Sequence, residues 1–297
     1  MKNNGGYQKR HQAVSSGTWL SRTGVAVKRL MFFIVLLAIF VYSFFPVVWI
    51  FLTAFKLDSQ IGRWPIEYMP NPFVLDQFTS AFRRVPLLRY TLNSIIVSGI
   101  ATILCVFVAT LASYPLSRLK IRGKPALMAF FVLLSTIPLI SMMVPLFEIF
   151  RSIGLLNNFQ SLIFPYAVFS LPICIWILTA FFREIPSDLE DSAMIDGCTR
   201  IGALVKVIFP LSAPGVATAT MMAFVNAWNE FTLAFTLITD RMMYTLPVGI
   251  TLLRDEFAVP WGMIAAGTVV AITPLVIIVI AFQKNLISGL TKGAVKG

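Results

Sequence analysis

Residues 183–197 read REIPSDLEDSAMIDG, a polar segment between two long apolar stretches. Ser187, with Glu190 three residues later, has the spacing of a capping box, in which two side chains satisfy backbone N–H groups at a helix start. Pro186, directly before Ser187, ends the preceding helix because proline lacks the N–H that a helix interior needs. The segment therefore predicts a short helix that begins near Ser187.

Gly197 marks the end of this helix, since glycine readily takes the left-handed conformation that follows many helices. Thr199 is suited to cap a second helix that runs toward Pro210. The small side chains of Ser192 and Ala193 would let another protein approach closely. We therefore expect two short helices at the cytoplasmic surface, acidic and able to accept another protein. The alternative is an ordinary surface linker.

The composition is that of a membrane protein. The chain has 297 residues, of which 58% are hydrophobic and 12% charged, whereas soluble domains have about 25% charged residues. This excludes a soluble enzyme, a disordered protein and a nucleic-acid-binding module. We interpret the net charge of +11 as a sign of how the chain is oriented in the membrane, because basic residues of membrane proteins gather on the cytoplasmic side.

Six stretches are apolar enough to cross a bilayer, which takes about 20 residues each. Lipid offers no hydrogen-bond partner to the backbone, so each stretch is expected to be a helix. The sequence thus predicts an all-α membrane protein with a transmembrane domain over residues 30–283. Its six helices are expected at 30–55, 91–116, 126–147, 159–182, 213–238 and 263–283.

Basic residues set the expected orientation. The N-terminal tail, residues 1–29, and the C-terminal tail, residues 284–297, carry lysine and arginine but no acidic residue, and so does the loop 118–124. The exception is the loop 56–90, which has five basic residues but also three acidic ones, and long loops bias orientation less. Both tails and the loop 183–212 are therefore predicted to be cytoplasmic, and the first span is predicted to be an uncleaved signal anchor.

The polar segment resembles the EAA motif of ABC importer permeases. Asp191-Ser192-Ala193 falls at the triplet, Gly197 at the glycine, and Val207-x-Phe209-Pro210 at the terminal element, with mild departures at Asp191, Ser192, Val207 and Phe209. The resemblance implies a coupling helix that docks into a cleft of an ATP-binding subunit. The residues expected to carry this contact are Leu189, Glu190, Asp191, Ser192, Ala193, Met194, Ile195, Asp196 and Gly197.

Further elements resemble the maltose-type and multiple-sugar branch of these permeases. They are Asn93-Ser94, the WNEF sequence at 228–231, Thr245-Leu246-Pro247 and the GAVKG tail at 293–297. The resemblance implies a type I ABC importer permease fold in the cytoplasmic membrane of a bacterium or archaeon. It implies as partners a second permease subunit, two ATP-binding subunits and an extracytoplasmic solute-binding protein, and as cargo a sugar or a related polyol.

No catalytic or metal-binding residue is expected. The only histidine is His11, the three cysteines are widely spaced, and no Gly-x-x-x-x-Gly-Lys-Ser/Thr element occurs. The chain is therefore expected to be a non-catalytic subunit without its own cofactor, with ATP and magnesium bound by the partner ATPase.

Glu230 is the one ionisable residue well inside a predicted span, and such residues are functional-site hypotheses by default. Asn226 lies one turn earlier on the same helix face, and Trp228 and Asn229 lie between them. Amide, carboxyl and aromatic groups suit the path or gate of a sugar. The alternative is that Glu230 caps or braces neighbouring helices near an external gate.

The predicted external loop before the sixth span is a second candidate surface. The resemblance implies that this loop contacts the binding protein, through Leu253, Arg254, Asp255, Glu256 and Phe257. The alternative is a solvated charged turn.

Two other functions compete with an importer permease. An ion-coupled secondary transporter would need several intramembrane ionisable groups or repeat symmetry, and only Glu230 is present. A membrane-embedded enzyme would need a nucleophile–base pair or a metal site, and the sequence has neither pattern.

Overall fold

The structure, a computed structural model, describes residues 15–255 and 259–294. In these ranges the regular backbone is entirely helical. Five helices are long: α1 Ser15–Thr53, α3 Leu87–Arg118, α6 Gln160–Glu184, α10 Ala213–Asn229 and α13 Trp261–Ala294. The shorter ones are α2 Asp76–Arg84, α4 Lys124–Ser135, α5 Leu139–Ser152, α7 Ser187–Ile195, α8 Arg200–Ala203, α9 Phe209–Leu211, α11 Thr232–Leu237 and α12 Leu246–Thr251.

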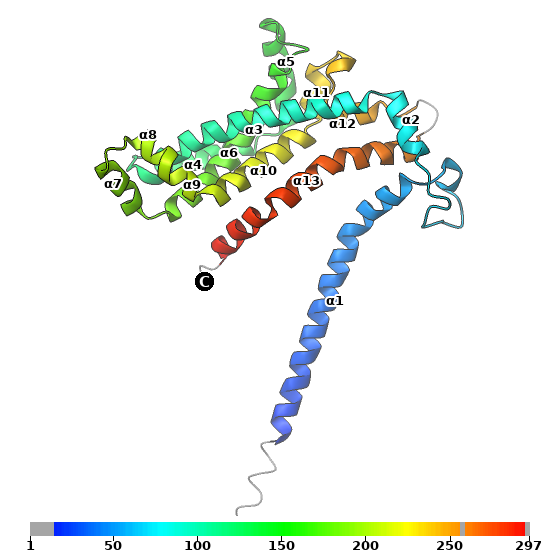
Figure 1. The fold of residues 1–297 in the computed structure, drawn as a ribbon, viewed down its shortest axis with the longest axis horizontal. Helices are drawn as coiled ribbons and strands as arrows, with labels where there is room; N and C mark the ends of the chain where they lie inside the picture. Colours follow the sequence, from blue (N-terminus) through cyan, green and yellow to red (C-terminus); the bar gives the residue numbers. More distant parts are fainter. Residues whose placement is uncertain (1–14, 256–258, 295–297) are drawn as a thin grey trace, which may run out of the picture.

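Helices α3, α6 and α10 pack against one another and form the centre of the bundle (Figure 1). Small side chains such as Ala109, Cys174, Ala219 and Ala223 are buried where these helices meet. Small residues let helix backbones approach closely, which supplies the packing that lipid-exposed helices need. Helix α13 covers α10, and α1 packs on α13.

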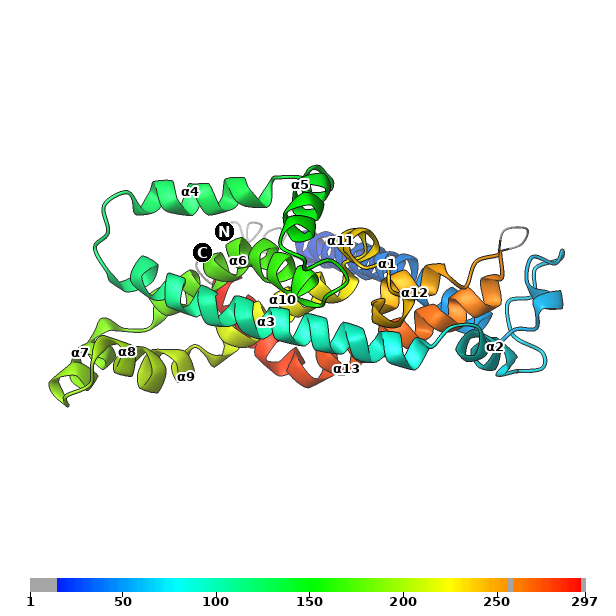
Figure 2. The ribbon, with the colours of Figure 1, turned by 90° about the horizontal axis from the view of Figure 1, so that it is seen from above.

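The bundle has two distinct ends. Helices α7 and α8 lie at one end and α2 at the other, with α3 running between them (Figures 1 and 2). We call these the α7 end and the α2 end. Helix α1 meets the rest of the chain near the α2 end and then diverges from the bundle.

Four helices are long and apolar enough to cross a membrane: Val27–Thr53, Leu87–Arg118, Gln160–Glu184 and Trp261–Gln283. Two bent helix pairs, Lys124–Ser135 with Leu139–Ser152 and Arg200–Leu211 with Ala213–Asn229, raise the number to six if each pair is one span. The expected all-helical membrane fold is therefore confirmed. Helix α1 begins at Ser15, within the predicted N-terminal tail, and residues 1–14 and 295–297 of the predicted tails lie outside the described ranges.

The prediction of a continuous third span over 126–147 was wrong. Helices α4 and α5 meet at 87°, and Pro138 between them has an extended backbone with φ −62° and ψ 128°. Proline removes a helix hydrogen bond and disfavours the helical conformation of the residue before it. The chain therefore turns sharply within a stretch for which hydropathy predicts one helix.

The prediction of a continuous fifth span over 213–238 was also wrong. Helix α10 ends at Asn229, and Glu230 is extended with φ −70° and ψ 126° before α11 begins at Thr232. Apolar periodicity continues through this break, so hydropathy alone does not reveal it. The break places the Glu230 side chain at the start of a new helix.

Candidate functional site

Helix α7 ends as the sequence predicts. Gly197 has φ +91°, the Gly197 N–H donates to the Met194 carbonyl at 3.1 Å, and the Cys198 N–H donates to the Ala193 carbonyl at 3.0 Å. These two bonds form a Schellman motif, which satisfies the last carbonyls of a helix. The predicted cap of the second helix is confirmed too, since Thr199 Oγ1 accepts from the Gly202 N–H at 3.1 Å.

The predicted capping box at the start of α7 was wrong. Pro186 occupies the N-cap position, and no side chain caps the helix there. Ser187 lies inside the first turn, and the carboxylate of Glu190 is directed toward α3 instead. Glu190 therefore interacts with α3 and not with the start of its own helix, where the local pattern placed it.

The outward face of α7 combines acidic and apolar side chains. Asp191 and Ser192 are exposed, and Leu189 and Ile195 are 45% and 85% exposed. Ile201 in α8 is also exposed, by 68%. Exposed apolar groups with polar neighbours mark surfaces that contact another protein. Most of the predicted docking residues are accessible in this way, whereas Ala193 and Met194 are half-buried.

Glu190 is the exception on α7, because it is only 7% exposed. The Tyr114 hydroxyl donates to Glu190 Oε1, and Arg118 Nε lies 3.2 Å from Glu190 Oε2 as an ion pair. Tyr114 and Arg118 occupy the last turns of α3. In the sequence, Arg118 belongs to the basic loop 118–124 that indicates the orientation of the chain in the membrane. No local pattern pairs Arg118 with Glu190, which lies far along the chain.

A cavity of about 260 Å³ lies beside the break between α4 and α5. Asn226 from α10, Ser170 from α6 and Ser135 from α4 contribute its polar groups, and Glu230 also reaches its wall. Its full lining is Leu134, Ser135, Ile137, Leu139, Tyr166, Phe169, Ser170, Asn226, Ala227 and Glu230. The structure thus brings two of the four predicted path residues together at one cavity.

The carboxylate of Glu230 braces three elements. Its Oε1 accepts from the Leu233 N–H at 2.8 Å, and its Oε2 accepts from the Ala234 N–H at 3.2 Å. The Tyr166 hydroxyl of α6 donates to Oε2 at 2.6 Å. A carboxylate at a helix start is stabilised by the free N–H groups there, so Glu230 joins α10, α11 and α6.

The other two predicted path residues point elsewhere. Trp228 is 2% exposed, its Nε1–H donates to the Ala271 carbonyl of α13 at 3.2 Å, and its ring stacks on Phe224. Asn229 donates to the Val225 carbonyl at 2.9 Å and does not line the cavity. Trp228 therefore holds α10 to α13.

The predicted binding-protein loop is only partly described. Leu253 is fully buried, and Glu256 and Phe257 lie outside the described residues. Arg84 of α2 donates to Asp255 Oδ2 at 2.9 Å and to the Arg254 carbonyl at 3.4 Å. The hydrogen bond from Arg84 lowers the pKa of Asp255 below its usual value, so this exposed pair ties the loop to α2.

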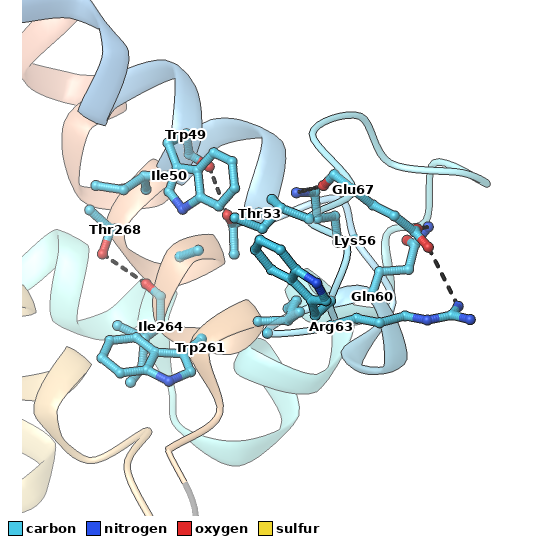
Figure 3. Close-up of a pocket in the computed structure, with 15 residues that line it drawn as sticks. Trp49, Ile50, Thr53, Lys56, Gln60, Arg63, Glu67, Trp261, Ile264 and Thr268 are labelled. Atoms are coloured by element: carbon cyan, nitrogen blue, oxygen red, sulfur yellow. Dashed lines mark hydrogen bonds and ion pairs between the residues drawn. The ribbon is translucent and has the colours of Figure 1, made fainter. Parts of the chain in front are cut away.

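A second, larger pocket of about 640 Å³ lies at the α2 end and was missed by sequence reasoning. Figure 3 shows Trp49 of α1 and Trp261 of α13 at this pocket, with Lys56, Gln60 and Glu67 from the loop after α1. Lys56 Nζ lies 4.4 Å from the Trp49 ring centroid and donates to the Glu67 carbonyl at 2.6 Å. Burial lowers the pKa of Lys56, against the charge of Glu67. Indole rings beside polar groups suit the membrane–water interface.

Comparison with known proteins connects these features to a family. The family model described as "Binding-protein-dependent transport system inner membrane component" matches residues 102–292. This range includes α6, α7, α10 and most of α3 and α13.

Three relatives match nearly the whole chain. The sulfoquinovosyl glycerol transport system permease protein SmoH of Agrobacterium fabrum is 45% identical, covering 89% of this chain and 93% of that protein. The trehalose transport system permease protein SugB of Mycobacterium tuberculosis is 40% identical, with 86% and 93% covered. The trehalose/maltose transport system permease protein MalG of Thermococcus litoralis is 36% identical, with 91% and 98% covered.

Solved structures show the same fold. A chain of a bacterial ABC transporter involved in the import of the acidic polysaccharide alginate matches with a TM-score of 0.75 at 20% identity, covering 88% of this chain and 98% of that chain. A second chain, from the bacterial alginate ABC transporter in complex with alginate pentasaccharide-bound periplasmic protein, matches with a TM-score of 0.65 at 17% identity, covering 89% and 94%.

Proposed function

Because this chain belongs to the binding-protein-dependent transport system inner membrane components, we propose that it is the membrane subunit of an ATP-driven sugar importer. The cargo is a sugar or a related polyol, which a solute-binding protein delivers for passage into the cytoplasm. The relatives SmoH, SugB and MalG are permeases of transport systems for sulfoquinovosyl glycerol, trehalose and trehalose/maltose, which supports this class of cargo. The comparisons give no support to an ion-coupled transporter.

The observation that carries the proposal is the geometry of α7. This helix is fixed at its C-terminal end by the Schellman motif at Gly197 and presents exposed Leu189 and Ile195 at the α7 end. A separate ATPase subunit docks on this face with bound ATP and magnesium. Its closure on ATP moves α7, and hydrolysis resets the permease, so this chain itself remains non-catalytic.

The exposure of α1 supports a second permease subunit. In the most apolar window of Val27–Thr53 none of the residues is buried within this chain, and α1 contacts mainly α13. A spanning helix with so little packing inside its own chain gains van der Waals contacts from a neighbouring helix. The second subunit packs on α1 and completes the translocation path.

The cavity beside Asn226 forms part of that path. Its wall at the α4–α5 break and its amide and hydroxyl groups suit the hydroxyl groups of a sugar. The α2 end is extracytoplasmic in this proposal, so the loop at Arg254 and Asp255 faces the binding protein, while the α7 end and the two tails, residues 1–29 and 284–297, are cytoplasmic.

Replacing Asn226 by alanine tests whether this residue contacts the solute or only supports the fold. We expect solute uptake to fall about ten-fold with unchanged complex yield, because the cavity loses a hydrogen-bond partner for the solute. Asn229→Ala should lower uptake much less, since the Asn229 amide is bonded to the Val225 carbonyl. Equal effects of the two substitutions would contradict the assignment of Asn226 to the path.

The cargo is tested with proteoliposomes that contain the purified complex, its binding protein and enclosed ATP. Radiolabelled trehalose, maltose and sulfoquinovosyl glycerol are the probes, and an amino acid is the control solute. Uptake of at least one glycoside, dependent on ATP and on the binding protein, is the expected result. Uptake of the amino acid alone would contradict a sugar importer.

A further inference from the structure

We propose that Glu190 clamps α7 to α3, and that α3 carries the displacement of α7 along the bundle to the loop of residues 242–246 at its other end. The inference rests on the proposed coupling role of α7 and adds the route by which that coupling reaches the α2 end. In this account Glu190 is a positioning residue, because it acts through α3.

The clamp itself is built from buried charge. Glu190 and Arg118 have side chains only 9% and 11% exposed, and their nearest charged atoms are 3.2 Å apart. The Tyr114 hydroxyl donates to the other carboxylate oxygen of Glu190. Breaking a buried pair by removing one partner is costly, because the remaining charge is left uncompensated. The three side chains therefore oppose separation of α7 from α3.

Arg118 depends on Glu190 to neutralise its charge, because the guanidinium has few other partners. Its Nε contacts Glu190 Oε2 as an ion pair at 3.2 Å, but neither Nε nor the buried Nη2 makes a hydrogen bond to the side chains and backbone described for residues 27–255 and 259–283. The carboxylate of Glu190 is the acidic group that the structure pairs with this guanidinium. Moving α7 without α3 would separate Arg118 from this counter-charge.

The opposite end of α3 is anchored just as specifically. Asn93 Nδ2 donates to the carbonyls of Met242 at 3.0 Å and Tyr244 at 2.9 Å. Ser94 Oγ accepts from the Leu246 N–H at 2.7 Å. Both α3 residues are buried. The loop before α12 is therefore bound directly to the start of α3.

Helix α3 has 32 residues in all, and the part from Asn93 to Arg118 is about 38 Å long at 1.5 Å per residue. It packs along both α6 and α10 (Figure 2). Pro115 removes one helix hydrogen bond beside the clamp, but α3 stays helical through it, so a shift of its Arg118 end displaces its Asn93 end. The two hydrogen-bonded ends make α3 a continuous link between the docking face and the α2 end.

The clamp is tested by distance measurements between spin labels in the complex with its ATPase, using ATP as the only added ligand. Labels are placed on cysteines introduced at Ser187 in α7, outside the docking set, and at Leu111 in α3, both exposed, with Cys198 replaced by serine. We expect one narrow distance distribution, unchanged between the nucleotide-free and ATP-bound complexes. Glu190→Gln should broaden it in both states, because glutamine does not neutralise Arg118.

Two further variants test whether a broadened distance distribution comes from loss of the clamp itself. Glu184→Gln removes the same charge from an exposed position at the end of α6 and should leave the distribution narrow. Glu190→Gln alone should lower the complex yield, because it leaves the charge of Arg118 uncompensated. Combining it with Arg118→Met removes that charge, so the complex yield should rise again while the distance distribution stays broad. A distribution as narrow as that of the unaltered chain in both the single and the double variant would overturn the clamp.

A second label pair separates this inference from the coupling role on which it rests. The distance from Ser187 to a label at exposed Ile280 in α13 should change when ATP binds. No change there would contradict the coupling role of α7. The effect of Glu190→Gln on the Ser187–Leu111 distance would still decide whether the clamp exists.

Discussion

Gly197→Asp is expected to leave membrane insertion intact and to lower ATP-driven uptake more than about ten-fold. At φ +91° a residue with a Cβ costs about 1–2 kcal/mol relative to glycine. No heavy atom lies within 4 Å of the Cβ position, so the effect comes from backbone conformation and charge rather than from a clash. A negative charge at a helix C-terminus adds about 0.3–1 kcal/mol.

Gly197→Asn is the matched control, because asparagine has the shape of aspartate without its charge and shares its tolerance of the left-handed conformation. It should retain more uptake than Gly197→Asp, by the part of the loss that the charge causes. The measurement is solute uptake and ATP hydrolysis in proteoliposomes, with the amount of inserted chain determined in the same membranes. Normal uptake by Gly197→Asp would exclude α7 as the docking helix.

Glu230→Ala is expected to lower complex yield and uptake in parallel. The change removes the cap of α11, worth about 1 kcal/mol, and leaves the Tyr166 hydroxyl without its acceptor, worth about another 1–3 kcal/mol. The three hydrogen bonds of Glu230 are all made within the chain. The structure therefore favours the bracing role over direct contact with solute.

Tyr166→Phe provides the control for this prediction, since it removes the hydroxyl and leaves the two backbone bonds of Glu230 in place. Its yield should stay close to that of the unaltered chain. Complex yield is read from purified, detergent-solubilised material, and uptake is normalised to it. A Glu230→Ala complex that assembles normally but fails to transport would assign Glu230 to the path instead.

Local signals correctly predicted the fold class, the C-terminal end of α7 and the cap of α8. Hydropathy marks stretches long enough to span a membrane, and the Gly197 and Thr199 positions are determined by conformation and capping within a few residues of each site. Such short-range rules need no knowledge of the rest of the fold. The resemblance of the polar segment to the EAA motif led to the family that the comparisons show.

The features that were missed depend on residues distant in the sequence. Glu190 bonds to α3 rather than to its own helix start, and Glu230 turns a hydrophobic run into two helices by capping the second. Hydropathy also does not show that Trp228 faces α13, or that Trp49 and Trp261 meet at one pocket. Tertiary packing decides such positions, and it is not encoded in a local pattern.

The central claim, that this chain is driven by a separate ATPase, is tested most directly by affinity purification of the tagged chain in mild detergent. The account predicts that a P-loop ATPase and a second multi-span protein are recovered with it in defined stoichiometry. Recovery of this chain alone, still able to transport solute in liposomes without ATP, would contradict the account.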